Sequence, residues 1–261
     1  MIICHSRKFI FVKTKKTAGT TVEIALSRAC TEGDIVTDLA ERREPRFADE
    51  PANALSMQKN LFDIDKGGKK QQFGFKEHSN IAHPYMMFGE RVADYKIITV
   101  ERNPWEKIIS QFFYLKKSRL EDSAEFTKFV EGGEFVTDFV LYGVRGIPFY
   151  DYCIRQEHLT EDLEQVRREL DLPDSVAIGD ITTKTTERPK EASRRRDMYG
   201  DTARRIVECA FLPELHHTGY SFDAVDCPPI QPSPLRIPAR KAFAAHTAKR
   251  VKDWTITARQ P

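Results

Sequence analysis

Two short apolar runs, each followed by a polar turn and a helical pattern, limit the fold more than any other feature of the sequence. The first run is "KFIFVKT" at residues 8–14, and the second is "YKIITVE" at residues 95–101. Runs of this length, rich in β-branched and aromatic residues, are typical of strands that are covered on both faces, as in a parallel sheet. We therefore expect an α/β protein, a three-layer sandwich with a mainly parallel central sheet.

A helix start signal follows each of these two runs. Thr20 and Glu23 form an S/T-x-x-E capping box, which predicts a helix that Thr20 caps. Asn103 is a natural N-cap residue and Pro104 fits the first helical position, which predicts a second helix from residue 104 onward. Each strand is therefore expected to lead into a helix through a short turn.

The rest of the chain carries weaker patterns. We expect helices at 123–131 and 135–143, a strand within 151–159, a helix capped by Thr160, and a helix over part of 190–211. Residues 38–75 are charged and broken by Pro and Gly, which predicts a surface insertion with a short helix near 53–61. The Pro-rich residues 227–261 predict a C-terminal extension that follows a single domain over residues 1–226.

The composition argues against several classes of protein. The formal net charge of the 261 residues is only +2, so no overall basic field predicts nucleic-acid binding. The five cysteines are scattered and odd in number, which predicts free thiols in a reducing compartment. No apolar run resembles a secretory leader or approaches the length of a membrane span. We therefore expect a cytoplasmic protein.

The first strand ends in a turn that suits an anion. Residues 13–21 read "KTKKTAGTT", so three lysines surround or precede a turn of small residues. Small residues let an anion approach the backbone, and the helix behind them directs free N–H groups and the positive end of its dipole at the turn. A Walker A loop would place Lys-Ser/Thr directly after the glycine. The order found here argues against a magnesium-dependent ATPase or GTPase.

The second strand runs into Arg102, and Ser110 lies eight positions further along the chain. Two helical turns take about 7.2 residues, so both side chains are expected on one face of the helix. An arginine fork and a serine hydroxyl together suit a terminal phosphate. Ligands of such folds bind at the carboxyl ends of the strands, and both loops fall there. The two loops predict a site with two anion-binding parts.

Together, the two loops resemble the nucleotide-binding signatures of sulfotransferases that use 3′-phosphoadenosine 5′-phosphosulfate. The first signature usually reads like "pKTAGTS" and the second like "vRNPwdRlvS", and this chain has "KKTAGTT" and "VERNPWEKIIS". The resemblance is closest to the carbohydrate-type branch, which includes bacterial members and the heparan and chondroitin sulfotransferases. It extends in the same order to "KEHSNIAHPY" (76–85), "DYCIRQEHLTEDL" (151–163), "TTKTTERP" (182–189) and "HHTGYSF" (216–222).

The resemblance implies a P-loop NTPase-like sulfotransferase fold and a metal-independent transfer of a sulfuryl group to a hydroxyl acceptor, here a carbohydrate or a glycosylated metabolite. It also implies that Lys16 stabilises the leaving group and that His78 takes the proton of the acceptor. The donor-binding residues that it implies are Lys16, Thr17, Ala18, Gly19, Thr20, Thr21, Arg102, Ser110, Lys184 and Thr185.

The catalytic assignments leave alternatives at the level of sequence. Lys15 adjoins Lys16, so the register of the catalytic lysine is ambiguous by one residue. His83 is a close rival of His78 as the base, and Glu77 is a weaker one.

Other features depart from the family's pattern or admit other functions. Glu101 stands where the family often has an apolar or neutral residue, and it either points into the sheet edge or pairs with a lysine. Of the three adjacent arginines at 194–196, at most two can reach one anion. The alternative functions are a small-molecule kinase that uses ATP and a non-catalytic nucleotide-binding relative.

Overall fold

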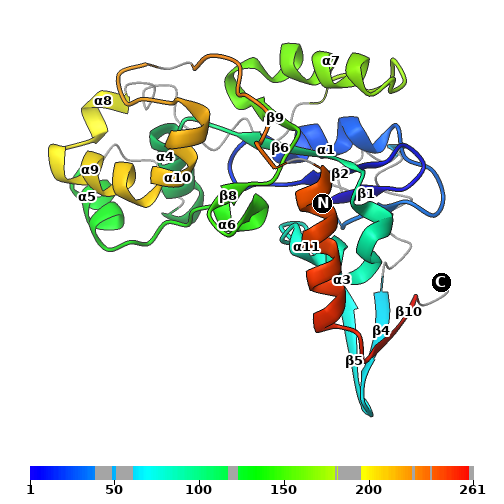
Figure 1. Ribbon diagram of the computed structural model, residues 1–261. Helices are drawn as coiled ribbons and strands as arrows, with labels where there is room; N and C mark the ends of the chain where they lie inside the picture. Colours follow the sequence, from blue (N-terminus) through cyan, green and yellow to red (C-terminus); the bar gives the residue numbers. More distant parts are fainter. Residues whose placement is uncertain are drawn as a thin grey trace.

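The two apolar runs are adjacent parallel strands in the computed structural model of the chain (Figure 1). They form β2 (Phe9–Val12) and β6 (Lys96–Glu101), and β9 (Tyr152–Arg155) adds a third parallel strand beside β6. The five-stranded sheet has the order β3-β1-β2-β6-β9. The pairings of β1 (Ile2–Cys4) with β2 and with β3 (Ile35–Val36) are antiparallel, so the sheet is mixed. The predicted α/β class with parallel strands is therefore confirmed, although the sheet is parallel only in part.

The structure describes residues 1–38, 49–50, 61–116, 123–179, 181, 195–224, 227–235 and 237–258. The short helix expected near 53–61 lies almost entirely outside these residues. Within the described part of the chain, no helix is long and apolar enough to cross a membrane.

Different elements cover the two faces of the main sheet (Figure 1). On one face, α1 (Gly19–Ser27) and α7 (Leu159–Glu169) bury apolar side chains against alternate residues of β1, β2 and β6. On the other face lie α3 (Ala82–Phe88) and α11 (Ile237–Arg250). The alternation of side chains along each strand explains why both faces are apolar.

A second, smaller sheet extends beyond α3 and α11 in Figure 1. It consists of β4 (Leu61–Lys66), β5 (Lys69–Gly74) and β10 (Trp254–Ala258), all antiparallel. The expected surface insertion therefore contains a hairpin, and the C-terminal segment returns to pair with it. A third sheet has two short strands, β7 (Gly143–Val144) and β8 (Ile147–Pro148), which follow α6 (Phe139–Tyr142).

Five of the helices after β6 form an aromatic core of their own, on the left of Figure 1, near the carboxyl ends of the parallel strands. They are α4 (Pro104–Lys116), α5 (Ser123–Glu131), α8 (Arg195–Met198), α9 (Asp201–Ala210) and α10 (Leu212–Thr218). Phe112 stands at the centre of this core, with the rings of Phe113, Phe126 and Phe129 at 5.3–5.4 Å. This packing fixes the direction of α4 as it leaves β6.

The two predicted helix starts have different outcomes. The second is confirmed, because Asn103 Oδ1 accepts a hydrogen bond from the backbone N–H of Trp105 at 3.2 Å, in front of α4. The capping box at the first is wrong. Helix α1 begins at Gly19 after Ala18 in the left-handed region, and no side chain caps it. Glu23 is instead fully buried and pairs with Lys13 at 3.0 Å.

Other boundaries differ by less. The helix predicted at 123–131 is confirmed as α5, whereas the one predicted at 135–143 is only the four-residue α6. Helix α7 begins at Leu159, so Thr160 lies inside the helix and does not cap it. Two non-helical residues, at 199–200, divide the described part of the last predicted helix into α8 and α9.

Candidate functional site

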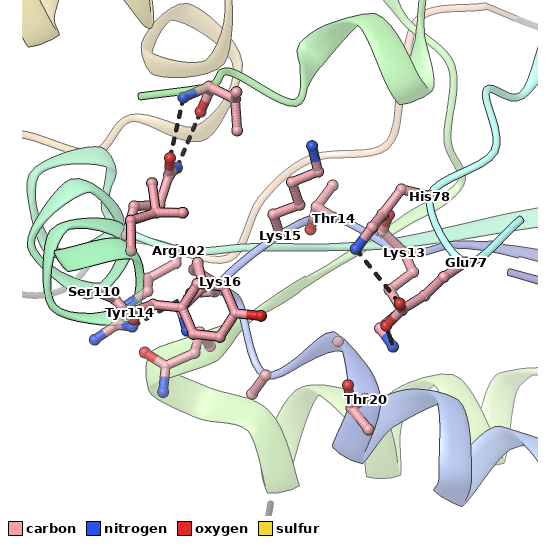
Figure 2. Close-up of a pocket in the computed structure, with 16 residues that line it drawn as sticks. Lys13, Thr14, Lys15, Lys16, Thr20, Glu77, His78, Arg102, Ser110 and Tyr114 are labelled. Carbon is pink, nitrogen blue, oxygen red and sulfur yellow. Dashed lines mark hydrogen bonds and ion pairs between the residues drawn. The ribbon is translucent and has the colours of Figure 1, made fainter. Parts of the chain in front are cut away.

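A cavity of about 600 Å³ lies at the carboxyl ends of β2 and β6. It brings together the loop at residues 13–20, the segment with Glu77 and His78, Arg102 directly after β6, and the second half of α4. Figure 2 shows Arg102, Ser110 and Tyr114 on one side of the loop and Glu77 and His78 on the other. The parts predicted from sequence therefore share one cavity.

The loop after β2 has a strained backbone at the edge of the cavity. Lys16 and Ala18 have φ angles of 59° and 62°, a left-handed backbone conformation that residues other than glycine rarely adopt. The backbone of Gly19 is packed closely, because a Cβ there would lie 2.8 Å from Cγ of Lys13 and 3.1 Å from the carbonyl oxygen of Thr14. Together with the N-terminal end of α1, where the helix dipole is positive, this geometry suits an anion.

Hydroxyl groups tie the loop to the strand beside it. Thr14 Oγ1 donates to the carbonyl oxygen of Val100 in β6 and lies 2.8 Å from Thr17 Oγ1. Thr17 is fully buried by these contacts, and Thr21 is buried inside α1. Neither lines the cavity, whereas Lys16, Ala18, Gly19 and Thr20 do. Thr17 therefore shapes the loop through Thr14, and both Thr17 and Thr21 leave the cavity surface to their neighbours.

The three lysines of the loop have different surroundings. Lys13 is buried between Glu23 and Glu77, and although burial opposes its charge, the two carboxylates raise the pKa of Lys13. Lys15 and Lys16 both line the cavity. Their environments differ, because the Lys16 Nζ lies 4.1 Å from the centroid of the Tyr114 ring, a cation–π contact. Lys16 is thus turned toward α4.

Arg102 and Ser110 line the cavity together, as the spacing predicts. Arg102 Nη1 donates to the carbonyl oxygen of Lys16 at 3.3 Å, and Nη2 lies 3.7 Å from Glu106 Oε2. The guanidinium group therefore touches the first loop directly. Arg102 therefore connects the two anion-binding parts, which are 86 positions apart in the sequence.

Asn103 fixes the position of Arg102 from behind. Its backbone N–H donates to Glu157 Oε1 at 3.0 Å, and its side-chain amide donates to the carbonyl oxygen of Ser221 at 3.0 Å. Tyr220 donates its hydroxyl to the other oxygen of Glu157 at 2.6 Å. The "EHL" and "GYSF" segments quoted above therefore surround the start of α4. None of the residues in these two segments lines the cavity, whereas Gln156, directly before Glu157, does.

His78 is placed as a neutral base. Its Nδ1 lies 3.0 Å from the carbonyl oxygen of Lys13. A carbonyl oxygen only accepts, so Nδ1 carries the proton and Nε2 keeps its lone pair in the neutral ring. Burial lowers the pKa of His78, and the Lys13 carbonyl and Glu77 oppose that shift. The ring is therefore largely neutral near pH 7.

The rival histidine lies elsewhere. His83 is in α3, with its ring 5.3 Å from that of Phe73, and it is not among the residues that line the cavity. Glu77 does line the cavity, but its carboxylate pairs with Lys13, which holds the pKa of Glu77 below its usual range against the effect of burial. Of the three candidates, His78 combines access to the cavity with a basic nitrogen, Nε2, which lies 4.0 Å from Glu77 Oε2.

A buried group of charges lies behind the loops. Lys107 of α4 is fully buried, and its Nζ lies 3.2 Å from Glu101 Oε2 and 2.9 Å from Asp138 Oδ2. This pairing resolves the departure at Glu101, which meets a lysine. Burial raises the pKa of Glu101, and burial together with the charge of Glu101 raises the pKa of Glu214 to about 7.

Some predicted residues cannot be placed and some lining residues were not predicted. Lys184, Thr185 and Arg194 lie outside the described residues, as do the side chains of Arg195 and Arg196. The lining residues that the sequence did not indicate are Thr14, Gln111, Tyr114, Leu115, Val136 and Gln156. Tyr114 carried one usable signal, because it lies four positions after Ser110 on α4.

Comparisons with known proteins add little to this description. No protein-family model and no solved structure matches the chain. Among curated proteins, it is similar to an uncharacterized protein of Archaeoglobus fulgidus, with 26% identity over 97 residues. That match covers 34% of this chain and 80% of the archaeal protein, and it assigns no family.

Glu214→Gln should remove a pH dependence of stability. Between about pH 4.5 and about pH 7, the folded protein keeps a proton on Glu214 that the unfolded chain loses, so the free energy of unfolding falls as pH rises through this window. Glutamine stays neutral and still accepts the hydrogen bond that the Phe139 N–H donates at 3.2 Å. In urea titrations we expect equal stability at pH 4 and a gain of about 2 kcal/mol for the variant at pH 8.

The matched control is Glu134→Gln, which changes a half-exposed glutamate in an ion pair with Lys116. It should shift the unfolding free energy by less than about 0.5 kcal/mol at both pH values. The same offset between wild type and Glu214→Gln at pH 4 and pH 8 would contradict the raised pKa of Glu214.

Proposed function

We propose that the protein is a sulfotransferase that moves a sulfuryl group from 3′-phosphoadenosine 5′-phosphosulfate to a hydroxyl acceptor. The observation that carries the proposal is that one cavity contains both the loop at 13–20 and the Arg102–Ser110 pair. A donor with anionic groups at both ends of its ribose needs two such parts. In this proposal the mixed α/β fold is of the P-loop NTPase-like sulfotransferase type, a three-layer sandwich.

The proposed reaction is an in-line displacement at sulfur. The acceptor oxygen forms a bond to sulfur while the bond from sulfur to the bridging oxygen breaks, and the electron pair stays on the 5′-phosphate of the leaving nucleotide. The acceptor proton passes to Nε2 of His78, which the contact of Nδ1 with Lys13 leaves basic. Lys16 stabilises the charge that builds on the leaving oxygen.

The two anion-binding parts have separate roles in this proposal. Residues 18–20, at the start of α1, hold the 5′-phosphosulfate, and Arg102 and Ser110 hold the 3′-phosphate. No step requires a metal, because the lysine supplies the positive charge at the leaving group. The acceptor proposed from the resemblance is a carbohydrate or glycosylated metabolite.

Ligand binding should separate this proposal from a kinase. In thermal-shift and calorimetric titrations, adenosine 3′,5′-bisphosphate should stabilise the protein more than ATP, with or without magnesium. A preference for ATP with magnesium would favour the kinase, and no stabilisation by either nucleotide would contradict the proposed donor.

Variants locate the donor site and the catalytic lysine. Arg102→Lys keeps the charge but loses the fork, so the affinity for the bisphosphate should fall by about tenfold. Lys16→Ala should abolish transfer, whereas Lys69→Ala, on the exposed hairpin, should change nothing. If Lys15→Ala abolishes transfer while Lys16→Ala does not, the leaving group lies one residue earlier in the loop.

The pH profile tests the role of His78. A base works only when it is deprotonated, so kcat/KM should fall as pH drops through the pKa of His78, and burial places that pKa below 6.5. His78→Gln should lower kcat by about 10²- to 10⁴-fold and remove this acidic limb. His83→Gln is the matched control and should keep both the rate and the limb. An unchanged profile in His78→Gln would exclude His78 as the base.

A further inference from the structure

The segment at residues 136–138, here called the bridging segment, is fastened to α4 at two points. The side-chain amide of Gln111 donates to the carbonyl oxygen of Val136 at 3.0 Å and accepts from its N–H at 3.0 Å. One turn earlier on the same helix, Lys107 pairs with Asp138 at 2.9 Å. Gln111, Lys107 and Asp138 are all nearly or fully buried, which makes these contacts rigid.

The other end of the bridging segment reaches the first loop. The backbone N–H of Lys15 donates to Asp138 Oδ2 at 2.8 Å, so one carboxylate oxygen is shared between Lys107 of α4 and the loop. Asp138 itself does not line the cavity. It acts on the residue directly before Lys16, whose backbone is in the left-handed region. A carboxylate suits this place because it only accepts hydrogen bonds.

The bridging segment thereby connects the two anion-binding parts of the cavity. Arg102 lies two residues before α4 and Ser110 lies within it, and the loop carries the other part. The distance between the phosphates of a bisphosphate nucleotide varies little, so affinity depends on how firmly the two parts are held apart. Arg102 also touches the loop, but its side chain belongs to the ligand site and Asp138 does not.

We propose that Asp138 is a positioning residue that holds the anion-binding loop at a set distance from α4, so that the cavity selects ligands with anionic groups at both ends. The inference rests on the proposed function for the identity of the ligand. The contact with Lys15 does not depend on that identity. Removing the Asp138 carboxylate leaves Lys107 paired with Glu101 at 3.2 Å, so the buried lysine keeps a partner.

The test compares two nucleotides in three variants. Asp138→Leu keeps the branched shape of the side chain and removes the acceptor, whereas Asp138→Asn keeps one acceptor oxygen for the Lys15 N–H. Glu134→Leu is the matched control, because this glutamate also pairs with α4, through Lys116, but is half exposed. Calorimetry measures the affinity of each protein for adenosine 3′,5′-bisphosphate and for adenosine 5′-monophosphate.

We expect the preference of the wild-type protein for the bisphosphate to fall about tenfold or more in Asp138→Leu, because a hydrogen bond to a charged group is lost. Asp138→Asn should restore most of the preference, and Glu134→Leu should keep it fully. An equal loss of affinity for both nucleotides would mean that Asp138 shapes only the loop. That result would overturn its proposed role in setting the distance between the loop and α4. An unchanged preference in Asp138→Leu would overturn the proposal entirely.

Hydrogen exchange separates failure of this inference from failure of the proposed function. The amide of Lys15 should exchange at least about tenfold faster in Asp138→Leu than in wild type, and Asp138→Asn should restore its protection. This readout needs no nucleotide. If the wild-type protein shows no preference for the bisphosphate while Lys15 loses protection in Asp138→Leu, the proposed donor is wrong and the positioning contact stands. Unchanged protection of Lys15 would overturn the contact itself.

Discussion

The ion pair between Lys107 and Asp138 connects three parts of the chain on which the site depends. Lys107 comes from α4, Asp138 from the segment before α6, and the same carboxylate oxygen accepts the N–H of Lys15 in the loop after β2. A buried lysine needs a carboxylate partner, and a backbone N–H facing the interior needs an acceptor. One aspartate meets both needs. The loop and α4 are therefore fixed to each other by a contact that leaves their cationic side chains to the cavity.

The cationic side chains at the carboxyl ends of β2 and β6 form two groups, one in buried ion pairs and one at the cavity surface. Lys13 and Lys107 are buried and balanced by the carboxylates of Glu23, Glu77, Glu101 and Asp138. Lys16 and Arg102 face the cavity, where the ring of Tyr114 and the backbone of Lys16 hold them in place. This division lets a protein of nearly zero net charge present a strongly cationic site.

The sequence was informative where local chemistry determines structure. The two apolar runs predicted two strands of a parallel sheet, and Asn103 with Pro104 predicted the start of α4, because strand composition and helix capping depend on neighbouring residues. The capping box at Thr20 and Glu23 failed because Glu23 pairs in the core with Lys13 and with the N-terminal amine of Met1. Local propensity loses to tertiary contacts in such cases.

The candidate site shows the same limit. The eight-residue spacing of Arg102 and Ser110 predicted that they would meet, and they line one cavity. Asp138 was not predicted, because its partners Lys15 and Lys107 lie 123 and 31 positions away along the chain. Val136 and Gln111 are likewise joined only through folding, 25 positions apart. Contacts of this kind have no signature in a single sequence.

The most direct test of the account is a crystal structure of the protein with adenosine 3′,5′-bisphosphate. The account predicts the 5′-phosphate within hydrogen-bonding distance of the backbone N–H groups at residues 18–20, and the 3′-phosphate against Arg102 and Ser110. It also predicts His78 Nε2 facing the open side of the 5′-phosphate. A nucleotide bound elsewhere, or bound with its 3′-phosphate far from Arg102, would contradict the claim that this cavity is a two-ended donor site.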